Sequence, residues 1–125
     1  MPWPKRKRER AENRGSSLRS MVRHGRTVIS REDFAFVIGY SGSTAIVDAW
    51  QRRRYGGLGT LELAQRGLYR AALASAIHGG REEEMRAVLG AYNSGAAVPV
   101  ESVEHLKRLF GVSGVPPGIT HVKRL

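Results

Sequence analysis

The sequence predicts an all-α protein, a small bundle of four to five short helices with a central helical hairpin, preceded by a disordered basic arm. Apolar residues recur at helical spacing through residues 29–112, and glycines separate these runs from one another. Residues 1–28 hold two prolines, scattered arginines and almost no periodic apolar residues. We therefore divide the chain into an arm (1–28), a helical domain (29–112) and an extended C-terminal tail (113–125).

Order is expected to begin at Ser30. This serine stands three residues before Asp33, as a helix N-cap does, and apolar residues from Phe34 onward follow at helical spacing. Read with a period of two, the same stretch is a strand with Phe34 and Phe36 on one face. Residues 34–48 therefore remain open between a helix and a pair of strands.

A second helix is predicted in the segment AIVDAWQRRRY, residues 45–55. Ser43 or Thr44 can cap its start, and Gly56-Gly57 ends it. Trp50 is expected to pack inward from this helix, with an arginine across its exposed edge.

The central hairpin is predicted over residues 60–92. Thr60 caps a first helix with the widest apolar face in the chain, and Gly79-Gly80 closes it. The segment REEEMRAVLGAY follows, with acidic residues in its first turn, where they suit the helix dipole. Two helices joined by two glycines form a hairpin.

The last predicted helix is VESVEHLKRLF, residues 100–110, and Gly111 ends it. The run Pro116-Pro117-Gly118 prevents a further helix, so the segment ITHVKRL is expected to be extended.

The charge of the chain is unevenly distributed. Lys and Arg total 21 against 11 acidic residues, a net charge of +10, and 17 of the basic residues are arginine. Residues 1–28 hold nine of the basic and two of the acidic residues, so this segment carries +7 of the total. Such a segment is suited to binding polyanions.

The composition of the chain argues against cysteine chemistry, a membrane span and a signal peptide. The chain has no cysteine, which removes disulfides, thiolate metal sites and cysteine nucleophiles. No apolar run approaches the roughly 20 residues of a membrane span, and no apolar core follows the basic start as in a signal peptide. We expect a cytoplasmic protein with no membrane span.

Two segments resemble catalytic motifs. Arg23-His24-Gly25 with Thr27 resembles the signature of the histidine phosphatases, but the residues before it, ENRGSSLRS, do not read as the buried strand of that family. Segment 34–44, FAFVIGYSGST, resembles the nucleophile elbow of the α/β-hydrolases, except that Ser43 stands where that motif requires glycine. We therefore predict that the protein is not an enzyme.

Two further segments resemble binding motifs. The stretch VEHLKRLFGVSG resembles the first helix and turn of a helix-turn-helix, but prolines occupy the place of the recognition helix. Residues 74–93 are similar to the core of an ankyrin repeat, but only one copy is present. The four histidines are well separated and form no ligand pattern, so we predict no metal and no cofactor.

The basic residues of the arm are the candidate site. We expect them to contact nucleic-acid phosphates, because guanidinium binds phosphate bidentately. They are Lys5, Arg6, Lys7, Arg8, Arg10, Arg14, Arg19, Arg23 and Arg26. Arg52, Arg53 and Arg54, beside Trp50 and Tyr55, are possible secondary contacts. If helical, they fan through about 200° at about 100° per residue and cannot all face one ligand.

These observations predict a small non-catalytic protein that binds nucleic acid or a ribonucleoprotein without sequence specificity. The alternative is a helical protein-protein interaction or scaffold module, with a partner bound through the 60–92 hairpin. In that case the arm only solubilises or localises the protein.

Overall fold

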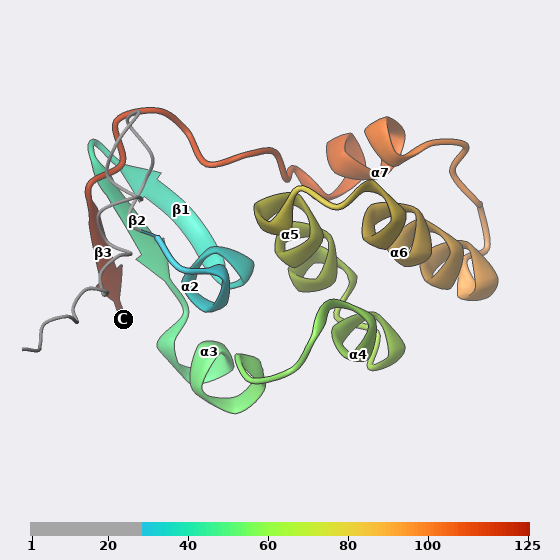
Figure 1. Ribbon diagram of the computed structural model, residues 1–125, viewed down its shortest axis with the longest axis horizontal. Coiled ribbons are helices and arrows are strands. Elements are labelled where there is room, and N and C mark those ends of the chain that lie inside the picture. The colour runs from blue at the N-terminus through green and yellow to red at the C-terminus, as the bar shows by residue number, and fades with distance from the viewer. Residues whose placement is uncertain (1–28) are drawn as a thin grey trace, which may run out of the picture.

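A computed structural model describes residues 29–125 and folds them into six helices and a three-stranded mixed sheet (Figure 1). The helices are α2 (Arg31–Ala35), α3 (Ala49–Tyr55), α4 (Thr60–Gln65), α5 (Tyr69–Gly79), α6 (Glu82–Gly95) and α7 (Val103–Phe110). The strands are β1 (Val37–Ser41), β2 (Thr44–Val47) and β3 (His121–Arg124). A mostly helical chain is confirmed, but the strictly all-α prediction is wrong. The predicted disordered arm lies outside the described residues.

The ambiguous segment begins as a helix and continues as a hairpin of strands. Ser30 is the predicted N-cap, and its hydroxyl accepts a hydrogen bond from the Asp33 backbone N–H at 3.1 Å. The helix stops after five residues, and β1 then pairs antiparallel with β2. Gly42, at φ +58°, allows the tight turn between them. Both strands contain β-branched residues, Val37 and Ile38 in β1 and Thr44, Ile46 and Val47 in β2, and such residues favour strand over helix.

The second predicted helix is divided between a strand and a helix. Its first residues form β2, and the cap is Asp48, not Ser43 or Thr44. The Asp48 carboxylate accepts from the Gln51 backbone N–H at 3.1 Å. Helix α3 is therefore short, and Gly56 ends it as predicted.

The C-terminal segment is extended, and its end completes the sheet. From α7 the chain crosses the molecule to lie beside β2 (Figure 1). There β3 pairs parallel with β2, with Thr44 opposite His121 and Val47 opposite Arg124, so the strand order is β1-β2-β3. The sequence predicts no sheet for this fold, and that prediction is wrong. The third strand comes from residues distant in sequence, which local patterns do not reveal.

The long helix predicted after Thr60 is broken in two. Gly67 adopts φ +80° between α4 and α5, a conformation that a continuous helix does not contain. Gly59 is the N-cap of α4, and its backbone N–H donates to the Glu62 carboxylate at 2.8 Å. Thr60 is instead buried, with its hydroxyl 2.7 Å from that of Ser75.

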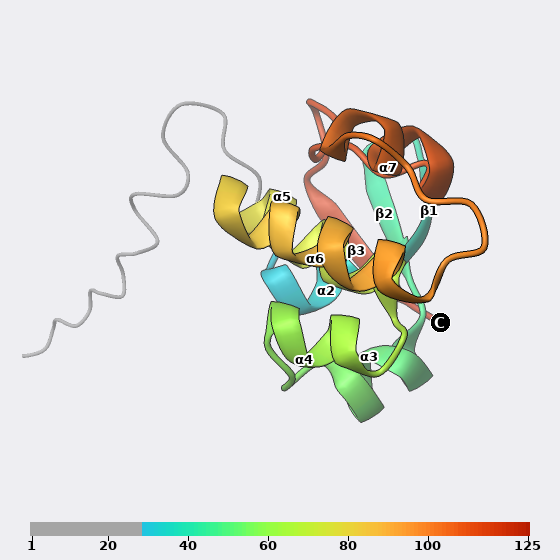
Figure 2. The same ribbon diagram turned by 90° about the vertical axis from the view of Figure 1, so that its right-hand side faces the viewer.

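Helix α5 is the centre of the core. It packs against α2, α4 and α6, and six consecutive residues from Ala71 to Ala76 are buried (Figure 2). The largest fully buried apolar side chains come from both halves of the molecule: Val47, Leu63, Leu73, Val88 and Leu106. The small alanines of α5 allow neighbouring elements to approach closely, so the sheet and the helices share one core.

Candidate functional site

The three consecutive arginines of α3 have three different environments. Arg52 donates from Nε to the carboxylate of Asp33. The guanidinium of Arg54 lies 5.7 Å from the ring centroid of Trp50 and 5.6 Å from that of Tyr55. Arg53 is exposed. The helical fan predicted from the sequence therefore separates one structural arginine from two that solvent can reach.

Trp50 is exposed, in contrast to the inward packing expected for it. Its side chain is 57% exposed, and its ring meets that of Tyr55 edge to face at a centroid distance of 6.3 Å. Together with Arg54, this gives an aromatic surface with a cation stacked on it. Such a surface can stack on an unpaired base.

Asp33 joins three separate elements through ionic hydrogen bonds. It is only 3% exposed. Arg124 of β3 donates Nε to Oδ1 at 2.9 Å and a terminal nitrogen to Oδ2 at 2.8 Å, while Arg52 of α3 also donates to Oδ1. Burial raises the pKa of the Asp33 carboxyl, but the hydrogen bonds from Arg124 and Arg52, and their charges, lower it below its ordinary value. Asp33 is therefore ionised at neutral pH. Its ion pairs with Arg52 and Arg124 connect α2 to α3 and to β3.

The same arginines line an open depression of about 620 Å³, which we call the arginine depression. Its lining residues are Ser30, Glu32, Asp33, Arg52, Arg53, Gly56, Gly57 and Arg124. Two of its three guanidiniums are held by Asp33, and Arg53 has no carboxylate within 4 Å among residues 29–125. Ser30, two positions after the basic segment 1–28 in the sequence, is part of this lining.

Arg31 is a structural arginine that the sequence analysis did not single out. One terminal nitrogen donates to the Ser75 hydroxyl at 2.9 Å. The other donates to the backbone oxygens of Gly56 at 2.9 Å and Leu58 at 3.0 Å. These bonds tie α2 to α5 and to the link between α3 and α4, so Arg31 positions the floor of the arginine depression.

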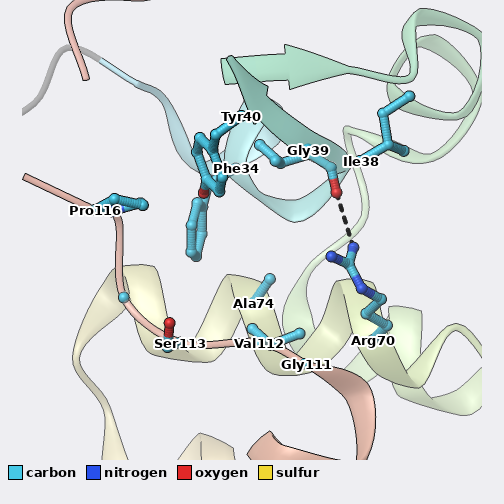
Figure 3. Close-up of a pocket in the computed structure, with 12 residues that line it drawn as sticks. Phe34, Ile38, Gly39, Tyr40, Arg70, Ala74, Gly111, Val112, Ser113 and Pro116 are labelled. Carbon is cyan, nitrogen blue, oxygen red and sulfur yellow. Dashed lines mark hydrogen bonds between the residues drawn. The ribbon is translucent and has the colours of Figure 1, made fainter. Parts of the chain in front are cut away.

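A second hollow, of about 270 Å³, lies between β1 and α5. Strand β1 forms the edge of the sheet opposite to β3. Figure 3 shows Arg70 reaching from α5 to the β1 backbone, where a terminal nitrogen donates to the Val37 oxygen at 2.9 Å. We call this hollow the β1 groove. Its lining residues are Phe34, Val37, Ile38, Gly39, Tyr40, Arg70, Ala74, Gly111, Val112, Ser113, Gly114 and Pro116.

Burial raises the pKa of the Tyr40 phenol, and the charge of Arg70 partly opposes this shift. The phenol is therefore neutral at physiological pH and can donate a hydrogen bond at the rim of the β1 groove.

The predicted primary contacts, Lys5 to Arg26, lie outside the described residues, as does His24. Of the secondary contacts, Arg53 and Arg54 are accessible, whereas Arg52 is bound to Asp33. The hydrolase-like segment covers the end of α2, all of β1, the turn and the first residue of β2, so its serines do not stand between a strand and a following helix as a nucleophile elbow requires.

Further features of the described residues bear on a histidine site, a metal site and a membrane span. His78 Nε2 lies 3.0 Å from the Ile29 oxygen, and its ring packs on Phe34. Within residues 29–125 no three His, Asp or Glu side chains cluster closely enough to hold a metal ion. Over the same range, no helix has the length and apolar character needed to cross a membrane. Comparison with protein-family models, curated proteins and solved structures found no match for this chain.

Proposed function

We propose that the protein is a non-catalytic binding protein that engages nucleic acid, free or in a ribonucleoprotein, without sequence specificity. The observation that carries this proposal is the position of Ser30 in the arginine depression. The segment with +7 of the net charge of +10 ends two residues before Ser30, and Ser30 lines the same depression as Arg53. On this proposal, the basic segment and the arginine depression act together on one ligand.

The two parts of the interface supply different interactions. Lysines and arginines of segment 1–28 neutralise phosphates and release counterions, which gives affinity without reading the bases. Arg53 adds a guanidinium from the folded part of the chain. Trp50 presents an aromatic face on which a base stacks, and such stacking tolerates every base. The chemistry favours single-stranded nucleic acid, whose bases are free to stack.

A salt titration tests this proposal. Anisotropy of a labelled single-stranded RNA of mixed sequence is measured with the full chain between low and physiological salt. We expect the logarithm of the binding constant to fall linearly with the logarithm of salt concentration, by about 0.7 per phosphate neutralised. A chain lacking residues 1–28 loses most of this slope. Absence of RNA binding at low salt would contradict the proposal.

A pair of charge-matched variants tests the contribution of the folded part. Arg53→Gln with Arg54→Gln removes two accessible cations beside Trp50. Each of these cations is expected to neutralise one phosphate of the single strand, so their removal reduces the slope by about 1.4. Arg81→Gln with Arg86→Gln removes the same charge from the N-cap and first turns of α6, where both arginines pair with glutamates, and is expected to change the slope little. Equal effects of the two pairs would show that only net charge matters.

A further inference from the structure

We infer that the β1 groove is a docking site for an extended peptide of a partner protein, one that carries a carboxylate beside an apolar side chain. This goes beyond the proposed function, because the groove lies at the other edge of the sheet from the arginine depression. The peptide adds to β1 as a further strand and places its carboxylate on Arg70.

The backbone of β1 is available for such pairing. Ser43 and Val47 direct their oxygens toward the C-terminal segment, where Ser43 accepts from Thr120 and His121 and Val47 accepts from Leu125. Alternate residues of a strand face opposite neighbours, so Thr44 and Ile46 face β1.

On β1, Thr44 pairs with Ser41 and Ile46 pairs with Gly39. Tyr40 lies between these two β1 residues, so its backbone N–H and C=O point away from β2. No described strand pairs with this edge. Tyr40 also lines the β1 groove, so its free backbone groups border the space that a peptide would fill.

The groove combines apolar walls with polar surface, and it holds one charged side chain. Phe34, Ala74 and Val112 form its buried walls (Figure 3). The exposed side chain of Ile38, at 59%, supplies further apolar surface beside them. An apolar side chain of the peptide gains from leaving water here.

Arg70 is the feature that specifies a carboxylate. Its bond to the Val37 oxygen fixes one terminal nitrogen, and the guanidinium has further N–H donors. No carboxylate among the described residues lies within 4 Å of it, as is also the case for Arg53, and only Arg70 of these two is held against the β1 backbone. No acidic residue lines the β1 groove. The guanidinium is thus positioned for an external carboxylate, which it can bind bidentately.

The space continues beyond Arg70, which favours a peptide over a compact small molecule. A neighbouring hollow of about 260 Å³ shares Val37, Ile38 and Arg70 with the β1 groove and extends to Gln51 and Phe110. A strand rises about 3.3 Å per residue, so a few extended residues can run along both hollows.

A second copy of this chain is a poorer occupant. Pairing β1 with β1 would bring the sequence VIGYS against itself, and this sequence contains no acidic residue to meet Arg70. Nucleic acid also fits poorly, since the groove offers one cation and therefore a single phosphate contact.

The probe for this inference is a short synthetic peptide of alternating valine and glutamate, with its glutamine and lysine counterparts as controls. Amide chemical shifts of the full chain are followed during titration. The acidic peptide is expected to shift Val37–Ser41 and Val112–Gly114, and the lysine peptide is not. The same acidic peptide with N-methylated backbone amides is expected not to bind, because it lacks the N–H donors needed to pair with β1. This control leaves the protein itself unaltered, so it cannot fail through misfolding.

Arg70→Gln is expected to weaken the acidic peptide about tenfold and to remove its advantage over the glutamine peptide. Arg66→Gln, an exposed arginine on the adjoining link, is the matched control and leaves affinity unchanged. Equal binding of the acidic and lysine peptides, shifts confined to residues other than Val37–Ser41 and Val112–Gly114, or retained binding of the N-methylated peptide would overturn the inference. Shifts of β1 that sedimentation traces to self-association, or no shifts at millimolar peptide, would also overturn the inference.

Discussion

The two edges of the small sheet differ in how their arginines are used. At the β3 edge, Arg124 is bound through two hydrogen bonds to the buried carboxylate of Asp33. At the β1 edge, Arg70 is bound to a backbone oxygen, which leaves its charge uncompensated by any described residue. The first arrangement stabilises the fold. The second holds a cation ready for a ligand.

The surroundings of the two edges reinforce this difference. On β3 the exposed residues include Lys123 and Arg124, and cations on an edge strand discourage the addition of another strand. On β1 the exposed residues are Ile38, Tyr40 and Ser41, beside the β1 groove. The two edges of one short sheet therefore differ in charge, and we propose a different ligand for each.

The largest effect is expected from removing the carboxylate on which the β3 edge depends. Asp33→Ala leaves Arg52 and Arg124 without their partner and removes the ionic contact between α2 and β3. Because both arginines are partly exposed and can turn to water, we expect a loss of about 2 to 3 kcal/mol in the free energy of unfolding.

Urea denaturation measures this loss. The control is Glu104→Gln, which removes an exposed pair with Lys107 and is expected to cost less than about 1 kcal/mol. Similar losses in the two variants would mean that Asp33 contributes no more than a surface ion pair.

The second prediction concerns pH. The pKa of Asp33 is lowered in the folded protein, so below a pH of about 4 the unfolded chain binds a proton that the folded chain does not. The contribution of Asp33 is therefore fully present above that pH and is lost as pH falls through its folded pKa. Denaturation midpoints measured across the acid range report this loss. In Asp33→Asn this part of the pH dependence should be absent, and an unchanged profile would refute the assignment.

The capping and end signals of the fold were predictable because they are local. Ser30, Gly80 and Gly111 stand where the sequence places a helix start and two helix ends. Gly67 was not recognised as a break, because an isolated glycine is also tolerated within a helix.

The sheet and the site depended on contacts between distant residues. Strand β3 has four residues and no apolar alternation, and its partner lies more than 70 positions earlier in the chain. Asp33 has the local pattern of a capping-box acid, which conceals its bonds to Arg52 and Arg124. Arg70 has no local signal at all, since only the fold brings it to β1.

A third prediction addresses the aromatic part of the basic interface. Trp50→Ala removes the ring on which Arg54 stacks, and we expect single-stranded RNA to bind about fivefold more weakly because a base can no longer stack there. Anisotropy titration measures this change. Leu61→Ala, which truncates another half-exposed apolar side chain on α4, is the control and should leave the affinity unchanged. Equal affinities of the Trp50 variant and the original protein would remove stacking from the mechanism.

The smallest effect is expected at the β1 edge. Ile38→Asp places a carboxylate beside Arg70, where it competes with the carboxylate of an acidic peptide. We expect affinity for the valine-glutamate peptide to fall about threefold relative to Ile38→Asn, which has the same shape without the charge. Both variants should retain their affinity for RNA. If the two variants bind the peptide equally, Arg70 is not the group that recognises its carboxylate.

The central claim is that the two edges of the sheet serve different ligands, and amide chemical-shift mapping of one sample with both ligands tests it most directly. Single-stranded RNA is predicted to shift Ser30, residues 50–54 and Arg124, and subsequent addition of the acidic peptide to shift Val37–Ser41 without displacing the RNA. Displacement of the RNA by the peptide, or shifts of one shared set of residues, would contradict the account.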